Sequence, residues 1–357
     1  MKTLITANID DDHLDRLENE LGLDVDYRPI AERDGRYSTD ELVDLLDGVE
    51  VFIVGFEGVS ADVMDAAPDL RIIACPRGGP DANVDISAAT ERGIPVLYAP
   101  GRNAVSVADF TLGLILSVAR HIAHGHHLLH VGEHTGEPKA DSAGGGERED
   151  VTWGVAKGSP YTEFKGPELV DETLGLVGVG AIGREVAERA AGFGMEIVGY
   201  DPFLDAEEMA EFGVEKVELD ELCRRSRFVS IHCPVTEGTR GLVGSEEFAL
   251  MSPDTYFINT ARGAIIDQDA LLAALQHDEL AGAALDVYDE EPLPSDHALL
   301  QLDNVVTTPH LAGASTGVID RHSEMVTNDI AAVLEGHEPT HAANDVAPQA
   351  SHRAGGD

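Results

Sequence analysis

Short apolar runs alternate with longer amphipathic stretches from the start of the chain onward. This alternation is typical of strand and helix units wound into parallel sheets. Ser38 and Ser60 stand where helices of the first series would begin, and serine is a preferred residue at that capping position. The first series predicts five strands, at residues 4–8, 25–28, 51–55, 71–75 and 95–98. We therefore expect a five-stranded α/β domain in the N-terminal part of the chain.

A second series of apolar runs predicts six more strands, at residues 173–178, 196–200, 228–233, 256–259, 283–287 and 304–308. Six strands match a full dinucleotide-binding sheet. Before this series, a long apolar helix is expected over residues 105–129, and a Gly-rich polar stretch over 132–166 is interpreted as a surface loop or arm. After it, residues 315–336 predict a helix long enough to return to the first domain.

The pattern predicts an α/β fold of two doubly wound parallel-sheet domains, one inserted in the other. We expect the outer domain to comprise residues 1–120 and 311–340, and the inserted domain residues 121–310. Residues 341–357 show no periodicity and predict a flexible tail. Open parallel sheets bind their ligands outside the carboxyl ends of the strands, so polar residues at those positions are the candidates for a site.

The clearest motif is a GxGxxG run made by Gly178, Gly180 and Gly183, which directly follows an apolar strand and begins a helix. Gly178 permits a tight turn, Gly180 lets the backbone approach a pyrophosphate, and Gly183 brings the helix against the strand. The free N–H groups at Ala181 and Ile182 would bind the phosphates. The motif predicts a dinucleotide site, which makes the inserted domain a Rossmann cofactor domain and the outer one a flavodoxin-like substrate domain.

Asp201 stands at the end of the following strand, 23 residues after Gly178. Its carboxylate can accept hydrogen bonds from both ribose hydroxyls, and its charge would repel a 2′-phosphate. No Arg occurs within residues 201–205 to reverse that preference. We therefore expect NAD as the cofactor rather than NADP. The alternative is that Asp201 only caps a loop.

Three polar residues follow the later strands of the second series: Arg262, Glu291 and His310. Taken singly, each is of a type common at surfaces and helix caps. Because the carboxyl ends of parallel strands meet at one edge of a sheet, however, the three place a cation, an acid and an imidazole together. That combination is suited to binding an anion and transferring a proton.

Six ordered motifs over roughly residues 72–334 indicate a family: AATERGIPVLYAPGRNAVSVADFTLGL, GVGAIG, HCPVTEGTRGLV, NTARGAIID, ALDVYDEEP and TPHLAG. With them the sequence resembles the D-isomer-specific 2-hydroxyacid dehydrogenases, which include phosphoglycerate dehydrogenases and glyoxylate/hydroxypyruvate reductases. The resemblance implies an NAD-dependent oxidoreductase acting on the CH–OH group, which reversibly reduces a small 2-oxo acid to the D-2-hydroxy acid. It also implies a homodimer.

The resemblance assigns the catalytic roles to Arg262, Glu291 and His310. Arg262 would hold the substrate carboxylate and polarise the carbonyl, while His310 would protonate the developing alkoxide as NADH delivers hydride. Glu291 would orient the imidazole and keep it protonated near neutral pH. The other implied cofactor contacts are Cys233, Thr260, Ala261, Asp286 and Gly313.

The substrate carboxylate is expected at a glycine-bearing loop of the first domain, where Arg77, Gly78 and Gly79 lie, with Asn83 and Asn103 nearby. This loop departs from the family's usual Gly-x-Gly-Val-Asp-Asn run, and only Asn83-Val-Asp85 is retained here. Arg77 would pair with a second anionic group of the substrate if it pointed inward; pointing outward, it would be a surface cation. We expect glyoxylate, hydroxypyruvate or branched 2-oxo acids ahead of 3-phosphohydroxypyruvate.

Two other functions compete with this interpretation. A dinucleotide-sensing regulator, similar to a corepressor, can be built on the same fold. Formate dehydrogenation is a chemistry of the wider family, but those relatives carry Gln where Glu291 stands. D-3-phosphoglycerate dehydrogenase is the alternative for the specific activity, although the chain ends soon after its last helix and regulation by serine is not expected.

Charge narrows the range of partners. The chain has 66 Asp and Glu against 24 Lys and Arg, a formal net charge of −42, and only five of the cations are Lys. Such a field argues against nucleic acid and anionic membranes as partners. Molar salt shortens the Debye length from about 10 Å to about 3 Å and relieves the self-repulsion. The composition resembles that of haloarchaeal proteins and predicts a halophilic protein; an acidic protein of an ordinary cytosol and a cationic partner are the alternatives.

Three cysteines, Cys75, Cys223 and Cys233, are widely spaced, so neither a disulfide framework nor a zinc site is indicated. The N-terminus does not resemble a signal peptide, and no apolar run reaches the roughly 18 residues that span a bilayer, so we expect a cytoplasmic protein. Several imidazoles share one helical face, but without acid or thiolate partners at ligand spacing we assign no metal. These histidines are His121, His124, His126, His127, His130 and His134.

Overall fold

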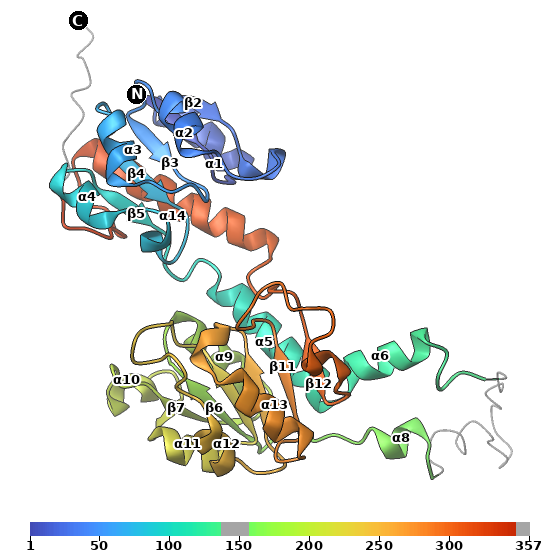
Figure 1. The fold of residues 1–357 in the computed structure, drawn as a ribbon. Coiled ribbons are helices and arrows are strands. Elements are labelled where there is room, and N and C mark those ends of the chain that lie inside the picture. Colours follow the sequence, from blue (N-terminus) through green and yellow to red (C-terminus); the bar gives the residue numbers. More distant parts are fainter. Residues whose placement is uncertain (137–156, 348–357) are drawn as a thin grey trace, which may run out of the picture. The chain divides into compact units, whose positions relative to one another are not determined.

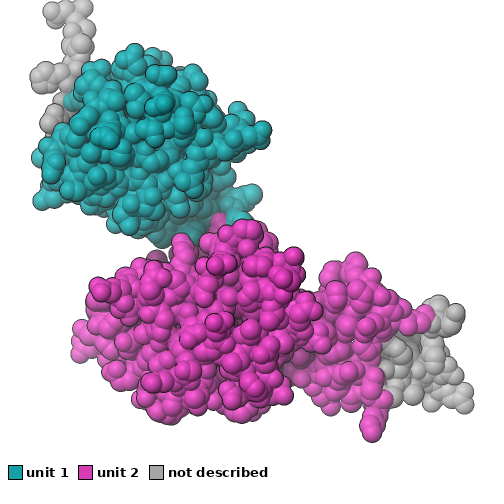
Figure 2. All heavy atoms as spheres, viewed as in Figure 1, with its two compact units in different colours: residues 1–103, 314–357 teal, residues 104–313 magenta. Residues whose placement is uncertain are grey.

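The computed structural model describes residues 1–136 and 157–347 (Figure 1). The chain divides into two compact units (Figure 2). The first unit comprises residues 1–103 and 314–357, and the second comprises residues 104–313. Each unit has an all-parallel sheet, with five strands in the first and seven in the second, so the predicted α/β fold class is confirmed.

The first unit has a parallel sheet in the order β2-β1-β3-β4-β5. Its strands are β1 (Lys2–Ile5), β2 (Asp24–Tyr27), β3 (Val51–Ile53), β4 (Ile72–Cys75) and β5 (Val96–Tyr98). Its helices are α1 (Asp11–Asp15), η1 (Arg16–Glu20), η2 (Ile30–Glu32), α2 (Thr39–Leu45), α3 (Ala61–Ala66), η3 (Pro80–Ala82), α4 (Ile86–Glu91) and α14 (Thr316–Glu335). Buried residues of α2, α3 and α4 form a core on one face, and α14 with η1 covers the other.

Helix boundaries in this unit follow the local chemistry of the sequence. The Ser38 and Ser60 hydroxyls accept hydrogen bonds from the first turns of α2 and α3, as predicted. Helix α14 begins after Ser315 and ends at Gly336, whose φ of +80° suits a glycine C-cap. Val326, Ile330 and Val333, spaced by four and three residues, bury one stripe of this helix against the sheet.

The second unit has a parallel sheet in the order β12-β11-β10-β9-β6-β7-β8. Its strands are β6 (Thr173–Val177), β7 (Glu196–Tyr200), β8 (Glu215–Lys216), β9 (Phe228–Ile231), β10 (Tyr256–Asn259), β11 (Gly282–Leu285) and β12 (Val305–Thr307). The edge strand β8 was not predicted, because two residues are too short for a pattern. The chain winds outward in opposite directions from β6 and β9, so the switch point of the sheet lies between these two strands.

Helices cover both faces of the second sheet. The helices of the second unit are α5 (Ala104–Ala119), α6 (Ile122–His130), α8 (Pro160–Glu163), α9 (Ala181–Gly192), α10 (Ala206–Ala210), α11 (Leu219–Arg225), α12 (Ser245–Leu250), η4 (Gly263–Ile265), α13 (Gln268–Gln276) and η5 (Ala298–Gln301). Residues of α5 and α9 share one core, and residues of α11, α12 and α13 share the other. This arrangement leaves the carboxyl ends of the strands free to carry a site.

The long apolar helix expected over residues 105–129 is two helices, α5 and α6, which meet at 65°. His121 causes the break, because its φ of +53° lies in the left-handed region that a right-handed helix cannot continue through. Helix α5 packs on α9 and on the second sheet, so the boundary between the units falls before it, at residues 103 and 104, rather than at residue 120.

The expected tail over residues 341–357 begins with ordered residues. Ala342 forms a bridge to Leu97, and the N–H of Ala343 donates to the Val96 carbonyl at 2.8 Å. The Asn344 side chain accepts the Val96 N–H at 2.9 Å. Residues 341–344 therefore extend the edge of the first sheet beside β5, whereas residues 348–357, like residues 137–156 of the expected arm, lie outside the described residues.

None of the described helices is by itself both long and apolar enough to cross a membrane. The bent pair α5 and α6 meets that criterion of length and composition only when its two helices are counted together.

Candidate active site

The glycine turn lies between β6 and α9. Gly178 has φ +97°, and a Cβ built there would lie 2.8 Å from backbone atoms that follow β9. A Cβ at Gly183 would lie 2.4 Å from the carbonyl oxygen of Gly178, so helix and turn meet backbone to backbone. Gly180 faces open space, and no described side chain caps the first turn of α9, which holds Ala181 and Ile182. The turn fits a pyrophosphate, since it offers both room and N–H donors.

Asp201 lies at the carboxyl end of β7, beside this turn. Its Oδ2 accepts the N–H of Val179 and its Oδ1 accepts the N–H of Phe203, both at 3.0 Å. A carboxylate oxygen has a further lone pair, so both oxygens can still accept a ribose hydroxyl. The loop-capping role that the sequence left as an alternative is thus present, and it fixes the carboxylate beside the glycine turn.

Arg262 lies in the turn between β10 and η4, which the buried Asn259 shapes. Asn259 accepts the N–H of Ala261 and donates to the carbonyl of Arg262, both at 3.0 Å. The next residue, Gly263, packs so closely that a Cβ there would lie 2.1 Å from the carbonyl carbon of Tyr288. The exposed guanidinium of Arg262 has one described hydrogen-bond partner, the Ala261 carbonyl at 2.6 Å. The turn is therefore fixed while the cation remains available to an anion.

Glu291 and His310 form a hydrogen-bonded pair, with Nδ1 of the imidazole 2.7 Å from Oε2 of the carboxylate. Oε1 of Glu291 accepts the N–H of Tyr288 at 3.1 Å. Burial acts to raise the pKa of Glu291, but these two hydrogen bonds and the charges of His310 and Arg262 lower it below its usual value. The ionised carboxylate thus holds the imidazole at Nδ1, and Nε2 is the nitrogen left for proton exchange.

Asp286 is fully buried and organises the turn that carries His310. Its carboxylate accepts the Thr308 hydroxyl at 2.6 Å, the Leu311 N–H at 2.7 Å and the Ala312 N–H at 2.8 Å. His310 itself has φ +56°, a left-handed conformation that a non-glycine residue keeps only where its surroundings enforce it. The resemblance placed Asp286 at the cofactor; in the structure its oxygens are engaged inside this turn.

A cavity of about 480 Å³ lies beside the pair. Glu291 and His310 line it together with Tyr288, Pro292, Leu293, Leu300, Thr307, Thr308 and Pro309. The Tyr288 hydroxyl lies 3.0 Å from the carbonyl oxygens of both Leu285 and Thr308, which share its one proton, and this fixes that wall. The described lining includes no Lys or Arg, so this cavity offers no second cation to a ligand.

The other predicted cofactor residues follow strands of the same sheet and share its carboxyl edge. Thr260 is buried after β10, with its hydroxyl 3.1 Å from that of Thr111. Ala261 and Gly313 are half-buried, in the turns that carry Arg262 and His310. Burial raises the pKa of Cys233 to about 11, so this residue after β9 stays a thiol.

Apart from Arg262, the residues predicted to bind substrate lie in the first unit, at the carboxyl ends of β4 and β5. Gly78 and Gly79 are exposed, and Asn103 is half-buried. Nη1 of Arg77 donates to Oδ1 of Asn83 at 2.8 Å. The predicted loop residues are therefore gathered at one edge of the first sheet.

The sequence motifs and this geometry agree with the comparisons to known proteins. Residues 112–312 match the family model described as D-isomer specific 2-hydroxyacid dehydrogenase, NAD binding domain. The chain belongs to this family of NAD-dependent oxidoreductases that act on the CH–OH group of 2-hydroxy acids. The match covers the glycine turn, Asp201 and the three residues Arg262, Glu291 and His310, and NAD is the cofactor that this domain binds.

Similar proteins in this family are named for different substrates. The chain is 39% identical over 83% of its length to D-3-phosphoglycerate dehydrogenase of Methanocaldococcus jannaschii, and spans 52% of that protein. It is 40% identical over 79% of its length to glyoxylate reductase of Thermofilum pendens, and spans 77% of it. The crystal structure of D-mandelate dehydrogenase from Rhodotorula graminis has a TM-score of 0.78 at 28% identity, with 98% of this chain and 99% of that one covered. The chain thus spans about half the length of the phosphoglycerate dehydrogenase it matches.

Sequence reasoning missed the groups that hold the catalytic residues in place. Asn259 was visible only as the last residue of a strand, although Asn at that position is typical of a turn. Gly263 and Tyr288 act through close packing and backbone hydrogen bonds, which leave no spacing pattern. The sequence also did not single out His232, which precedes Cys233. This residue is buried with its Nε2 2.8 Å from the Ser230 hydroxyl, and burial lowers its pKa to about 3.

Proposed function

We propose that this chain is a D-2-hydroxyacid dehydrogenase that uses NAD to reduce a small 2-oxo acid reversibly to the D-2-hydroxy acid. The observation that carries the proposal is the 2.7 Å hydrogen bond between Glu291 and His310, with Arg262 close enough for its charge to lower the pKa of Glu291. When bound, NAD(H) supplies or accepts the hydride. The protein's own residues bind and orient the substrate and move the proton.

Each of the three residues has a distinct task in this proposal. Arg262 binds the substrate carboxylate and polarises the neighbouring carbonyl. Nε2 of His310 donates a proton to the carbonyl oxygen as negative charge builds on it, and removes the hydroxyl proton in the reverse reaction. Glu291 stays ionised and stabilises the imidazolium. Asn259 and Asp286 are positioning residues, since they hold the turns that present Arg262 and His310.

The direct experiment is NADH oxidation with a panel of 2-oxo acids in molar KCl. We expect turnover of at least one compound and a D-configured product, with NADH preferred over NADPH because of Asp201. Binding of NADH should be measured in the same preparation by fluorescence. Tight NADH binding without turnover of any 2-oxo acid would contradict the proposal and favour a dinucleotide-sensing regulator.

The acidic composition supports a further part of the proposal, that the protein is halophilic. A net charge of −42 repels itself strongly at low ionic strength, and molar KCl screens most of that repulsion. We expect the melting temperature and the activity to rise with KCl up to molar concentration. Full stability and activity in dilute buffer would contradict this part alone.

Exposed apolar side chains on and beside α6 and α8 support a homodimer. Ile122, Leu129 and Val131 are 57, 57 and 56% exposed, and Tyr161 is 67% exposed. Ile122 and Leu129 are seven residues apart on α6 and share one face of that helix, and exposed apolar surface is typical of an interface. Sedimentation in molar KCl should give a dimer for the wild type and a monomer for Leu129→Asp. A wild-type monomer at every concentration would contradict it.

A further inference from the structure

Three side chains of the kind that bind metal ions converge where α1 packs on α14 in the first unit. Asp10 and His13 belong to the start of α1, and Asp320 belongs to α14. One ligand atom of each residue lies within 4.8 Å of those of the other two, and Nδ1 of His13 is 2.8 Å from Oδ2 of Asp10. Ligand atoms of one Zn²⁺ ion, with bonds of about 2.0 to 2.2 Å, lie about 3 to 3.5 Å apart. Small rotations of these side chains therefore bring the three atoms to a common ion.

Such a convergence is rare in this protein. The chain has 15 His and 66 acidic residues, yet within residues 1–136 and 157–347 this is the one group of three or more His, Cys, Asp or Glu that meets that distance. The contact of His341 with Asp329, at 2.9 Å, joins a single imidazole to a single carboxylate. His126 and His130 have ring centres 4.2 Å apart on α6, but no third ligand joins them among the described residues.

The charges of the group are not balanced by a permanent cation. Burial acts to raise the pKa of Asp10, but hydrogen bonds with His13 and Ser323 outweigh it and lower the pKa below its usual value. In the described part of the chain, Asp320 has no ion pair and no side-chain hydrogen bond. The guanidinium of Arg16, one turn further along, is engaged by Asn328 at 2.7 Å and Glu20 at 3.5 Å. Two carboxylates thus share one imidazole, a combination that a divalent cation would neutralise.

The ligands are held in place before any ion binds. The N–H of Asp10 donates to the hydroxyl of the buried Ser323 on α14 at 3.3 Å, and Oδ1 of Asp10 accepts the N–H of His13 at 3.1 Å. Beneath them, Leu17 of η1 shares a core with Val326 of α14. An ion that binds here does not have to order these segments first, which lowers the cost of binding.

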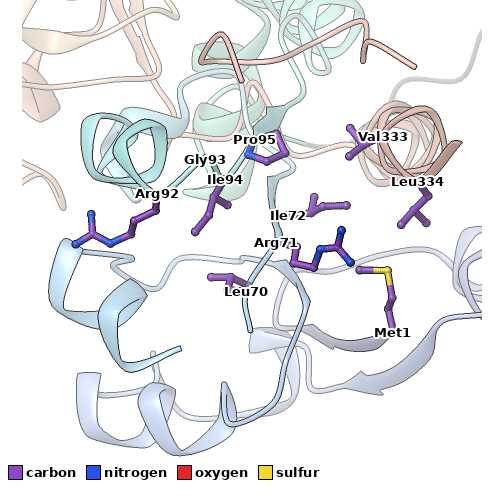
Figure 3. Close-up of a pocket in the computed structure, with 10 residues that line it drawn as sticks. All are labelled: Met1, Leu70, Arg71, Ile72, Arg92, Gly93, Ile94, Pro95, Val333 and Leu334. Atoms are coloured by element: carbon purple, nitrogen blue, oxygen red, sulfur yellow. The ribbon is translucent and has the colours of Figure 1, made fainter. Parts of the chain in front are cut away.

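A second candidate in the same unit lacks these properties. A cavity of about 100 Å³ lies at the amino ends of the strands, with Arg71 and Arg92 among its lining residues (Figure 3). The described lining has no His, Cys, Asp or Glu, so it offers no side-chain ligand to a metal ion. Arg92 is moreover paired with Asp65 at 2.7 Å. The convergence at α1 and α14 is therefore the better-built site.

We propose that Asp10, His13 and Asp320 bind one divalent transition-metal ion of the Zn²⁺ type, which links α1 to α14 and stabilises the first unit. An imidazole nitrogen with two carboxylate oxygens suits Zn²⁺ and similar ions, whereas Mg²⁺ and Ca²⁺ prefer oxygen ligands alone. Water completes the coordination. The role is structural, since none of the three ligands belongs to the catalytic set, and the inference does not rest on the proposed function.

The test is the thermal midpoint of the full chain, first freed of metal with EDTA and then titrated with ZnCl2 in molar KCl. A ligand of the native state raises the midpoint, and a Zn²⁺ concentration of about 100 times Kd should raise it by about 3 to 8 °C. MgCl2 at the same concentration and ionic strength should raise it by less than about 1 °C. Calorimetric titration of the same sample should give one tightly bound Zn²⁺ per chain.

Variants of the ligands assign the ion to this site. His13→Asn and Asp320→Asn should each weaken Zn²⁺ binding by at least about 10-fold, because even the loss of a partner behind a ligand costs about 10- to 100-fold. Asp320 is exposed, so Asp320→Asn should fold as the wild type does. The matched control is Asp12→Asn, the same change at an exposed residue of α1 outside the group, which should keep the affinity within about threefold.

A further control addresses the exposed histidines of α6. A double variant with His126→Asn and His130→Asn should keep the Zn²⁺ shift of the wild type. Loss of the shift in this variant, or an equal shift in Asp320→Asn, would place the ion elsewhere and overturn the inference. A wild type that Zn²⁺ does not stabilise, or that Mg²⁺ stabilises equally, would also overturn it. None of these outcomes depends on turnover of a 2-oxo acid.

Discussion

Both sheets of this protein carry cations at their carboxyl edges, but the two edges surround them differently. In the second unit, the imidazole of His310 is bound to an ionised carboxylate and the charge of Arg262 reaches the same acid. In the first unit, Arg77 and Arg102 are held by Asn83 and His322, which are neutral. A group that must gain and lose a proton benefits from a fixed acid beside it, whereas the two arginines of the first edge have only neutral hydrogen-bond partners.

Replacing His310 with Asn should have the largest effect on the second edge. Without the imidazole no group donates the proton, and loss of a general acid costs about 10²- to 10⁴-fold in rate. The measurement is kcat for 2-oxo acid reduction, with NADH binding as the check on folding. His277→Asn, at an exposed helix end of the same unit, is the control. A kcat within about threefold of wild type would exclude His310 as the acid.

Gly263→Ala tests whether close packing positions Arg262. Its added Cβ would lie 2.1 Å from the Tyr288 carbonyl carbon, so the turn must move. We expect kcat/KM to fall about tenfold and the free energy of unfolding to fall by about 1 to 3 kcal/mol, as for an overpacked core. Gly113→Ala, where nothing lies within 4 Å, should lose neither. An unchanged kcat/KM in Gly263→Ala would show that the turn does not set the position of the cation.

The smallest effect is expected from the two buried histidines, His322 and His232, one in each unit. It is an effect on how the free energy of unfolding changes with pH. Burial lowers the pKa of His322 to about 4 from 6.5. The unfolded chain therefore binds a proton that the folded chain does not, and stability falls as the pH drops from about 6.5 toward 4, by up to about 1.4 kcal/mol per pH unit for one group. His322→Gln should remove one such slope and leave that of His232. Denaturant unfolding at constant KCl measures it, and an unchanged slope would contradict a neutral His322.

Much of the site at the edge of the second sheet could be predicted from the sequence, and little of the arrangement at the edge of the first sheet. Arg262, Glu291 and His310 were predicted because each stands just after an apolar run, and parallel strands bring such positions together. Arg102 stands in a turn without a spacing pattern. Its hydrogen-bond partner His322 is distant in sequence and comes beside it only when α14 packs on the first sheet.

The elements missed have similar causes. The break at His121 was not predicted, because apolar residues continue across it and only the backbone conformation ends the helix. For Asp286 the family resemblance implied a cofactor contact, and the sequence did not show its part in the turn that carries His310. Its hydrogen bonds to Thr308, Leu311 and Ala312 depend on a turn that residue types alone do not define.

The most direct test of the central claim is the pH dependence of kcat/KM for 2-oxo acid reduction, compared between wild type and Glu291→Gln. An ionised carboxylate favours the protonated imidazole, and a neutral amide does not. The loss of activity with rising pH should therefore begin at a lower pH in Glu291→Gln, with a smaller maximum. Superimposable profiles would contradict the role of the Glu291–His310 pair as the proton donor.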